Sequence, residues 1–259
     1  MSKLKRLNSA FDIHWPKTHH ATKDALLDFN HATKPDVFLL GGDQFDNGCI
    51  SHFNKKKPFY RPRSAYRNDE RSFEAGFLTP LEASLPKGCE KVWVIGNHDA
   101  WEFQMVEEHP ELEGLIDRVT SLRLRERGWK IIEIGNAYRF GKLNFCHGEW
   151  LTGIGNQAGQ YPSKKLVDTY AGNAVGGHTH APQCFTRVSP INQSQKHMAW
   201  ISPILGNTNP EYMRNRPSAY TNGFNTTEFT ETGNFNHYPI ITTGGRCCFA
   251  GVSYPRGKK

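Results

Sequence analysis

The sequence lacks several features that would place it in a special class of protein. None of its 259 residues belongs to an apolar run of about 18, the length of a membrane span, and residues 1–6 lack the apolar stretch of a secretory signal. The six cysteines show no CxxC spacing, which argues against a zinc ribbon and against a disulfide framework. We therefore expect reduced thiols, no membrane partner and a cytoplasmic location.

What remains is the composition of an ordinary globular protein. Hydrophobic residues make up 37% of the chain and charged residues 22%, and the length suffices for one large core. Helix signals are expected at about 18–33, 102–108, 115–128 and 163–170, between short apolar runs. This alternation predicts an α/β protein.

Five short polar segments follow one another along the first 180 residues. They are Asp12-Ile13-His14, Gly42-Asp43-Gln44-Phe45-Asp46, Gly96-Asn97-His98-Asp99, His147-Gly148 and Gly177-His178-Thr179-His180. They end stretches that read as strands, including the apolar runs 37–40, 92–95 and 143–146. Because such strands deliver side chains to one edge of a sheet, we expect these polar residues to converge.

The order of these segments resembles the calcineurin-like metallophosphoesterase superfamily, whose signature is DxH, GDxxD, GNHD or GNHE, a lone His, and GHxH. The resemblance covers roughly residues 7–185. It implies a four-layer α/β/β/α sandwich of two mixed sheets flanked by helices. It also implies a single domain over residues 1–259, in which C-terminal strands at about 186–259 complete the second sheet.

The resemblance also implies a centre for two metal ions. The first ion would be held by Asp12, His14, Asp43 and His180. The second would be held by Asp43, Asn97, His147 and His178, with Asp43 as the bridge. Two cations about 3.5–4 Å apart neutralise a phosphate ester and activate water. The mixed ligands fit Mn²⁺, Fe, Zn²⁺, Co²⁺ or Ni²⁺ better than Mg²⁺ or Ca²⁺, and we favour Mn²⁺.

The remaining motif residues have roles beside the metals. In the superfamily the His of GNHD lies beside the leaving-group oxygen, and the second Asp of GDxxD accepts a bond from its other ring nitrogen. By this resemblance His98 is the general acid and Asp46 its partner, which keeps a proton available near neutral pH. Asp99 is expected to be structural, capping a helix or bracing a loop.

Departures from the superfamily pattern reduce the number of substrate classes that we expect. Phosphoprotein phosphatases of the superfamily carry Arg after the second Asp of GDxxD, where this chain has Asn47, and Asn47 is itself expected to bind substrate. The change removes a bidentate clamp for a terminal phosphoryl group and favours the prokaryotic and phage-type phosphodiesterase or nuclease branches. The first strand, 4–11, is unusually polar for the centre of a sheet.

Two groups of residues are candidates for substrate binding. An insertion at about 50–75 interleaves cations with aromatic residues, and its candidates are Lys55, Lys56, Lys57, Arg61 and Arg63. This composition suits nucleic acid, although a solvated loop is an equal alternative for a chain of net charge +7. Trp15, Trp101 and Trp150 each follow a metal segment and offer flat faces to a base, or else pack in the core.

The sequence thus predicts a metal-dependent phosphodiesterase that acts on a nucleic acid or a nucleotide. A phosphomonoesterase is the alternative within the same chemistry. A nucleic-acid-binding relative without turnover is the alternative from another class, but it should carry a broken ligand set, and none is broken here. The fold and the metal site do not define the substrate or the oligomeric state.

Overall fold

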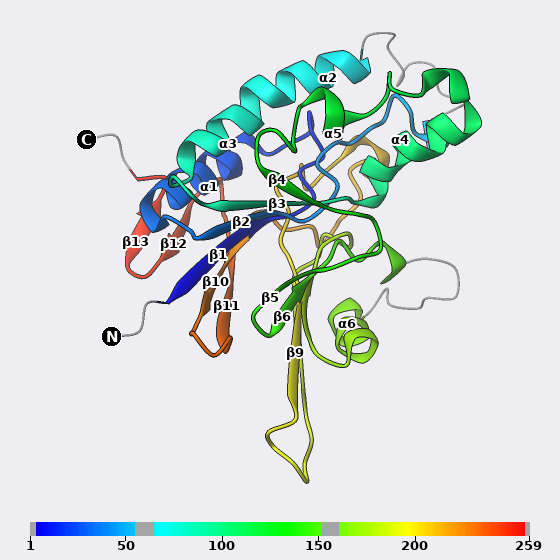
Figure 1. Ribbon diagram of the computed structural model, residues 1–259. Coiled ribbons are helices and arrows are strands. Elements are labelled where there is room, and N and C mark those ends of the chain that lie inside the picture. Colours follow the sequence, from blue (N-terminus) through cyan, green and yellow to red (C-terminus); the bar gives the residue numbers. More distant parts are fainter. Residues whose placement is uncertain (1–3, 55–64, 152–160, 257–259) are drawn as a thin grey trace.

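Two β-sheets packed face to face form the centre of the molecule in the computed structural model, which describes residues 4–54, 65–151 and 161–256 (Figure 1). The first sheet has the order β11-β10-β1-β2-β3-β4 and the second the order β5-β6-β7-β9-β8. Strands β1 to β4 are parallel, and β10 and β11 extend their sheet in antiparallel fashion. In the second sheet β6, β7 and β9 are parallel, and β5 and β8 are antiparallel edges.

The strands are short, as is usual in α/β proteins. The first sheet comprises β1 (Lys5–Ala10), β2 (Val37–Leu40), β3 (Glu90–Val94), β4 (Trp129–Ile132), β10 (Gly223–Phe229) and β11 (Phe235–Ile241). The second comprises β5 (Tyr138–Phe140), β6 (Leu143–Phe145), β7 (Asn173–Gly176), β8 (Gln183–Val188) and β9 (Lys196–Ile201). A separate hairpin consists of β12 (Cys247–Phe249) and β13 (Val252–Tyr254).

Helices cover the outer faces of both sheets, which confirms the expected α/β/β/α sandwich (Figure 1). They are α1 (His20–Thr33), α2 (Ala65–Phe73), α3 (Thr79–Ser84), α4 (Asn97–Glu108), α5 (Arg118–Ser121) and α6 (Pro162–Tyr170). One core cluster lies between α1 to α3 and the first sheet, a second between the sheets, and a third between the second sheet and α6. No helix in the described ranges has both the length and the apolar character needed to cross a membrane.

The central position of the polar strand β1 has a structural explanation. Asn8 and Ser9 are fully buried, but their side chains are hydrogen-bonded. Asn8 donates to Asn30 on α1 at 2.8 Å and accepts from Thr226 on β10 at 2.8 Å. Because buried polar groups are tolerated when paired, this network lets a polar strand occupy the middle of the sheet and place Asp12 and His14 at its end.

Two expectations about the elements were wrong. Only β8 and β9 of the C-terminal strands join the second sheet, because β10 pairs with β1 from Lys5↔Phe229 to Ser9↔Asn225 and so extends the first. The helix expected at 115–128 is reduced to α5, because Arg123 adopts a left-handed conformation (φ 52°) that a helix cannot continue. The turn lets Leu122 and Leu124 both enter the core. All six cysteines are free, as expected.

Candidate metal centre

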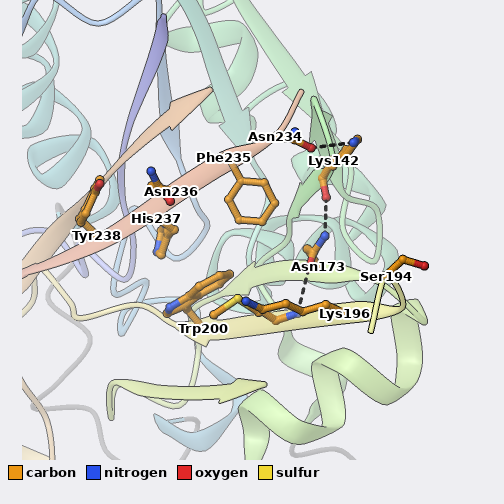
Figure 2. A pocket seen from close by; sticks show the side chains of 11 residues that line it. Lys142, Asn173, Ser194, Lys196, Trp200, Asn234, Phe235, Asn236, His237 and Tyr238 are labelled. Carbon is orange, nitrogen blue, oxygen red and sulfur yellow. Dashed lines mark hydrogen bonds between the residues drawn. The ribbon is translucent and has the colours of Figure 1, made fainter. Parts of the chain in front are cut away.

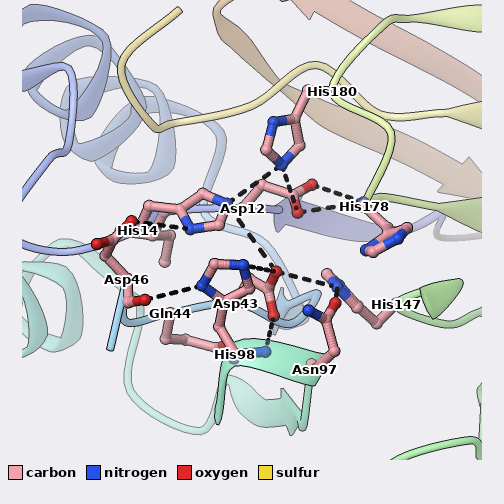
Figure 3. Close-up of polar contacts among 12 residues, drawn as sticks. Asp12, His14, Asp43, Gln44, Asp46, Asn97, His98, His147, His178 and His180 are labelled. Carbon is pink, nitrogen blue, oxygen red and sulfur yellow. Dashed lines mark hydrogen bonds and ion pairs between the residues drawn. The ribbon is translucent and has the colours of Figure 1, made fainter. Parts of the chain in front are cut away.

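The five polar segments meet at one edge of the sandwich (Figure 3). Asp12 and His14 follow β1, Asp43 follows β2, and Asn97 opens α4 directly after β3. From the second sheet, His147 follows β6, and His178 and His180 follow β7. These strands are parallel within each sheet, so their carboxyl ends deliver the side chains to the same place. The structure brings together all seven residues that the sequence predicts as ligands.

The backbone at these positions is strained. Positive φ angles, rare outside glycine, occur at Asp12 (52°), His14 (48°), Asp43 (53°), His178 (66°) and His180 (62°). Each such conformation costs of order 1–3 kcal/mol and persists only where the surroundings impose it. The cost is concentrated at the converging polar residues, as is common at functional sites.

Close packing explains two of the motif glycines. Gly42 has φ +99°, and a Cβ added there would lie 2.4 Å from the Nδ1 atom of His147. A Cβ added at Gly177 would lie 2.5 Å from a carboxylate oxygen of Asp12. A side chain at either position would displace a neighbouring polar group of the site.

Asp12, His14 and His180 form the first ligand cluster, with their ligand atoms within 4.8 Å of one another. The Nε2 atom of His180 lies 3.3 Å from Asp12 Oδ1 and 3.1 Å from Nε2 of His14. All three are buried, and the Nδ1 atoms of both histidines have no hydrogen-bond partner in the described chain. A fully buried carboxylate beside two imidazoles is a donor set that suits a transition-metal cation.

Asp43, His147 and His178 form the second cluster. The Nδ1 atom of His147 donates to the Gly41 carbonyl at 3.1 Å, and this bond leaves Nε2, 3.3 Å from Asp43 Oδ2, available as a ligand. The Oδ1 atom of Asn97 lies 3.0 Å from the same Nε2 atom.

Asp43 also reaches the other side of the site. Its Oδ2 atom is 3.9 Å from Nε2 of His14 and 3.8 Å from Nε2 of His98 (Figure 3). The carboxylate therefore lies between the two clusters, the position that a bridging ligand needs.

The pKa shifts of the Asp and His side chains also fit cation binding. Although burial opposes ionisation, the neighbouring histidines hold the pKa of Asp12 below its ordinary value and that of Asp43 well below it. Burial and nearby imidazoles lower the pKa of His14 to about 3 and that of His178 to about 4, so both rings are neutral and able to coordinate. Burial would lower the pKa of His147, but Asp43 raises it to about 10, so a cation would displace a proton there.

His98 lies beside the clusters, but its contact with Asp46 differs from the expectation. Its Nδ1 atom donates to the backbone carbonyl of Asp46 at 2.8 Å, not to the carboxylate. The carboxylate instead pairs with Lys17 at 2.9 Å. Since a carbonyl only accepts, Nδ1 carries a hydrogen and Nε2 is the nitrogen that faces Asp43.

Asp99 is structural, as expected. Its carboxylate accepts from the backbone N–H of Gly96 at 3.0 Å, which caps the start of α4. It also accepts from the N–H groups of Phe45 at 3.3 Å and Gln44 at 3.4 Å. One side chain thus joins the loop after β2 to the helix that carries Asn97 and His98.

Asn47 was wrongly expected to bind substrate. It is 1% exposed, its amide donates to the His98 carbonyl at 2.8 Å, and its Oδ1 accepts from Arg118. Arg118 is itself buried and paired with Glu102 at 3.0 Å. The only cation in contact with Asn47 within the described residues is therefore held inside the protein and is not a phosphate clamp.

Two of the three tryptophans are buried, so they take the core-packing role expected as the alternative and do not offer a flat face to substrate. Trp15 is 6% exposed and donates through Nε1 to Ser72 at 2.8 Å. Trp101 is 7% exposed, and its ring lies 4.0 Å from that of His98 at 30°. Trp150 is half-buried, with its ring centroid 6.1 Å from that of Tyr170, and its contact with substrate stays a prediction.

The basic residues of the insertion cannot be placed in the same way. Those predicted to bind nucleic acid lie outside the described residues: Lys55, Lys56, Lys57, Arg61 and Arg63.

One exposed aromatic ring near the site was not predicted from the sequence. Phe53 is 68% exposed and lies against His52, 3.8 Å between centroids, and 6.1 Å from Trp101. Trp101 in turn packs on His98, so aromatic rings lead from solvent to the candidate acid. The signal was the sequence His52-Phe53, one residue before the lysine run. Lys17 was missed as well, although it stands three residues after His14.

Comparisons with known proteins identify a family by sequence and a similar fold by structure. A family model described as calcineurin-like phosphoesterase matches residues 12–182, and no curated protein matches the sequence. Vacuolar Protein Sorting 29 from Cryptosporidium parvum has a similar fold, with TM-score 0.51, 11% identity and coverage of 98% of this chain and 99% of that one. A predicted phosphoesterase from Streptococcus pneumoniae TIGR4 is 9% identical at TM-score 0.38, covering 98% and 97%. Vps29 from Entamoeba histolytica complexed with zinc is 11% identical at TM-score 0.41, covering 91% and 98%.

Proposed function

Because the chain belongs to the calcineurin-like phosphoesterase family, we propose that it hydrolyses phosphodiester bonds in a nucleic acid or a nucleotide, with two divalent metal ions. The observation that carries this proposal is the position of Asp43 between the two His/Asp clusters. The whole chain, residues 1–259, is proposed as one domain, because β8 to β11 are built into both sheets.

The residues present fit the metal ions. Asp12, His14, Asp43 and His180 would hold one ion, and Asp43, Asn97, His147 and His178 the other. Bound there, the ions would neutralise the ester oxygens and activate water as the nucleophile. Mn²⁺ is favoured, with Fe, Zn²⁺, Co²⁺ or Ni²⁺ as alternatives.

His98 is proposed to deliver a proton to the leaving oxygen. The Asp46 carbonyl fixes its tautomer through Nδ1, so a proton gained by the ring resides on Nε2, which faces the site. Trp101 packs against the ring and restricts its orientation. Proton transfer from a positioned imidazole contributes about 10²–10⁴-fold in rate.

Two observations support a phosphodiester over a phosphomonoester. Asn47 stands where a phosphate-clamping arginine would be, and its side chain is occupied inside the protein. The exposed ring of Phe53 next to Trp101 offers a stacking surface for a base, which a small monoester does not need. Lys17 supplies a cation near the ligands, and the basic residues between 55 and 63 stay predicted contacts with nucleic acid.

Hydrolysis of two chromogenic esters tests the activity. With Mn²⁺, bis(p-nitrophenyl) phosphate should be cleaved more efficiently than p-nitrophenyl phosphate, and single-stranded DNA or RNA should be degraded. Efficient turnover of monoesters alone would support the phosphatase alternative. Metal binding without hydrolysis of any ester would support a non-catalytic role.

Replacement of Phe53 tests the stacking surface. Since a base stacked on an aromatic ring contributes about 1–3 kcal/mol, Phe53→Ala should raise KM for oligonucleotides roughly 5- to 150-fold. The KM for bis(p-nitrophenyl) phosphate should hardly change. Phe103→Ala is the matched control, because Phe103 is also exposed (46%) and lies on α4. Equal effects of the two variants would refute a role for Phe53 in binding bases.

A further inference from the structure

A hollow of about 410 Å³ lies between β9 and β11, but its indole and imidazole rings are buried (Figure 2). Trp200 is 6% exposed and belongs to the core between the two sheets, where its ring lies 6.0 Å from that of Phe235. The ring of His237 lies 4.8 Å from the same indole. These rings therefore complete the core between the sheets. The buried charge that reaches the candidate metal centre lies elsewhere.

A buried arginine packs against the loop that carries Asp43. Arg118 opens α5 and is 3% exposed. Its guanidinium group contacts two aromatic rings, at 3.6 Å from the ring centre of Phe45 and 4.1 Å from that of Tyr66. Phe45 belongs to the loop after β2, and Tyr66 lies on α2. One side chain thus joins the loop of the candidate site to two helices that are distant from it in sequence.

The polar contacts of Arg118 lead to His98. Its Nη1 atom donates to Glu102 of α4 at 3.0 Å and also to the Oδ1 atom of Asn47. The Asn47 amide in turn donates to the backbone carbonyl of His98 at 2.8 Å. Glu102 also accepts from the backbone N–H of Arg118 at 3.1 Å. The hydrogen bonds therefore run from α5 through Asn47 to the first turn of α4.

The direction of the Asn47 amide depends on Arg118. Arginine only donates hydrogen bonds, so the amide oxygen faces Arg118 and the amide nitrogen faces the carbonyl of His98, which only accepts. An apolar side chain in place of Arg118 would not orient the amide in this way. Because an apolar pair of similar volume is often as stable as a buried ion pair, stability alone does not explain the charge of Arg118.

We propose that Arg118 is a positioning residue for His98 and acts through Asn47. The inference rests on the role of general acid proposed for His98. Its peptide group is held at both ends, because its N–H donates to Asp43 at 2.9 Å and its carbonyl accepts from Asn47. Arg118 is buried and has no contact with substrate. Its contribution is the geometry of the residue that delivers the proton.

The dependence of kcat on the leaving group tests this proposal. Asn47→Gly permits the left-handed backbone at this position (φ 52°) and leaves the ion pair of Arg118 and Glu102 intact. It should lower kcat for a dinucleoside phosphate, whose leaving oxygen needs a proton, by about 10- to 100-fold. The kcat for bis(p-nitrophenyl) phosphate should fall by less than about threefold, because nitrophenolate leaves without a proton. Arg118→Lys should show the same selectivity, since an ammonium group lacks the planar shape of guanidinium.

A double-mutant cycle distinguishes positioning from a general structural effect. In the His98→Ala background, Asn47→Gly should lower kcat for the dinucleoside phosphate by less than about threefold, because the residue on which it acts is gone. Arg127→Met is the matched control. Arg127 also pairs with a glutamate, Glu82 at 2.7 Å, but it precedes β4 and so lies at the opposite edge of the sheet from His98. Its loss should leave the ratio of the two kcat values unchanged.

The NMR signal of the His98 Cε1–H group provides a readout that does not require activity. It is assigned by its absence from His98→Ala, and it senses the ring of Trp101, 4.0 Å away. In chelated protein the signal should shift in Arg118→Lys, whose change reaches His98 through Asn47, and stay in place in Arg127→Met.

Three results would overturn the proposal: equal losses of kcat on both esters, full additivity with His98→Ala, or an unshifted His98 signal in Arg118→Lys. A wild-type protein that hydrolyses neither ester would instead refute the proposed function. In that case the His98 signal alone decides whether Arg118 positions this residue.

Discussion

At the scale of single residues, His98 and Asp46 show how the structure refines a motif. The sequence pattern links the two residues, but it does not distinguish a backbone carbonyl from a carboxylate as the acceptor. Here the carbonyl holds the ring, and the carboxylate pairs with Lys17. Because every residue has a carbonyl, this contact survives replacement of the Asp46 side chain.

His98→Ala and Asp46→Asn should therefore differ strongly. His98→Ala should lower kcat for esters with poor leaving groups by about 10²–10⁴-fold, and much less for nitrophenyl esters, which need no proton. Asp46→Asn should lower kcat by less than about tenfold on either class, since His98 keeps its acceptor. The measurement is kcat on both substrate classes at constant metal content. A loss in Asp46→Asn as large as that in His98→Ala would show that the carboxylate itself is required.

His237 predicts part of the pH dependence of stability. Burial lowers its pKa from 6.5 to about 3, so the unfolded chain binds more protons than the folded one between these values. Burial of the neutral His237 ring is compatible with full stability above pH 6.5. As the pH falls from 6.5 towards 3, protonation of this histidine in the unfolded chain lowers the free energy of unfolding. Urea titrations from pH 3.5 to 7.5 should thus show a smaller slope against pH in His237→Gln than in the wild type. His197→Gln, on β9, is the control, and an unchanged slope in His237→Gln would contradict the prediction.

At the scale of elements, the sequence predicts best where the local signal and the packing agree. The apolar run 37–40 has the same bounds as β2, and the helix expected at 163–170 is α6, which begins one residue earlier. The predictions are wrong where contacts between distant segments determine the structure. β10 pairs with β1, and the helix ends before Arg123, whose left-handed conformation allows two leucines to be buried. Neither outcome is visible in hydrophobic periodicity.

Asp99 connects the stability of one element to the site. Asp99→Ala leaves three backbone N–H groups without their acceptor and should lower the free energy of unfolding by about 2 kcal/mol or more. It should also reduce activity, because the first turn of α4 carries Asn97 and His98. Asp117→Ala is the control. Asp117 caps α5 by accepting from Thr120 N–H at 3.1 Å, and its loss should cost about 1 kcal/mol without affecting kcat.

Denaturant unfolding and kcat, measured on both variants, separate the two effects. Full activity in a destabilised Asp99→Ala protein would show that the Asp99 contacts do not position His98.

At the scale of the whole molecule, the site could be predicted better than its surroundings. The candidate ligands are specified by residue type and by order along the chain, and all seven lie together in the structure. Substrate contacts depend on which side chains remain exposed after packing. Phe53 is exposed and can contact substrate, whereas Trp15 and Trp101 are buried and cannot. The burial of Asn8 and Ser9 in a central strand likewise depends on partners as distant as Thr226. Sequence patterns do not contain these pairings.

The arrangement of both sheets around one centre predicts that metal binding stabilises the entire fold. Five strained positions among the proposed ligands, and two buried carboxylates, gather at this centre from both sheets, so a cation that binds them should favour the folded state only. At a free metal concentration a hundred times Kd, the gain should be about 2.7 kcal/mol. For a chain of this size, the melting temperature should rise by roughly 5–10 °C.

Differential scanning calorimetry of chelated and Mn²⁺-loaded protein, with metal analysis of each sample, measures this effect. Asp43→Asn should bind less metal and lose most of the rise, because the second cluster loses its only carboxylate and His14 of the first cluster loses the negative charge 3.9 Å away. Asp24→Asn, an exposed control on α1, should behave as the wild type. Fewer than one equivalent of metal in the reconstituted wild type, or an equal rise in Asp43→Asn, would contradict a centre in which Asp43 joins the two sites.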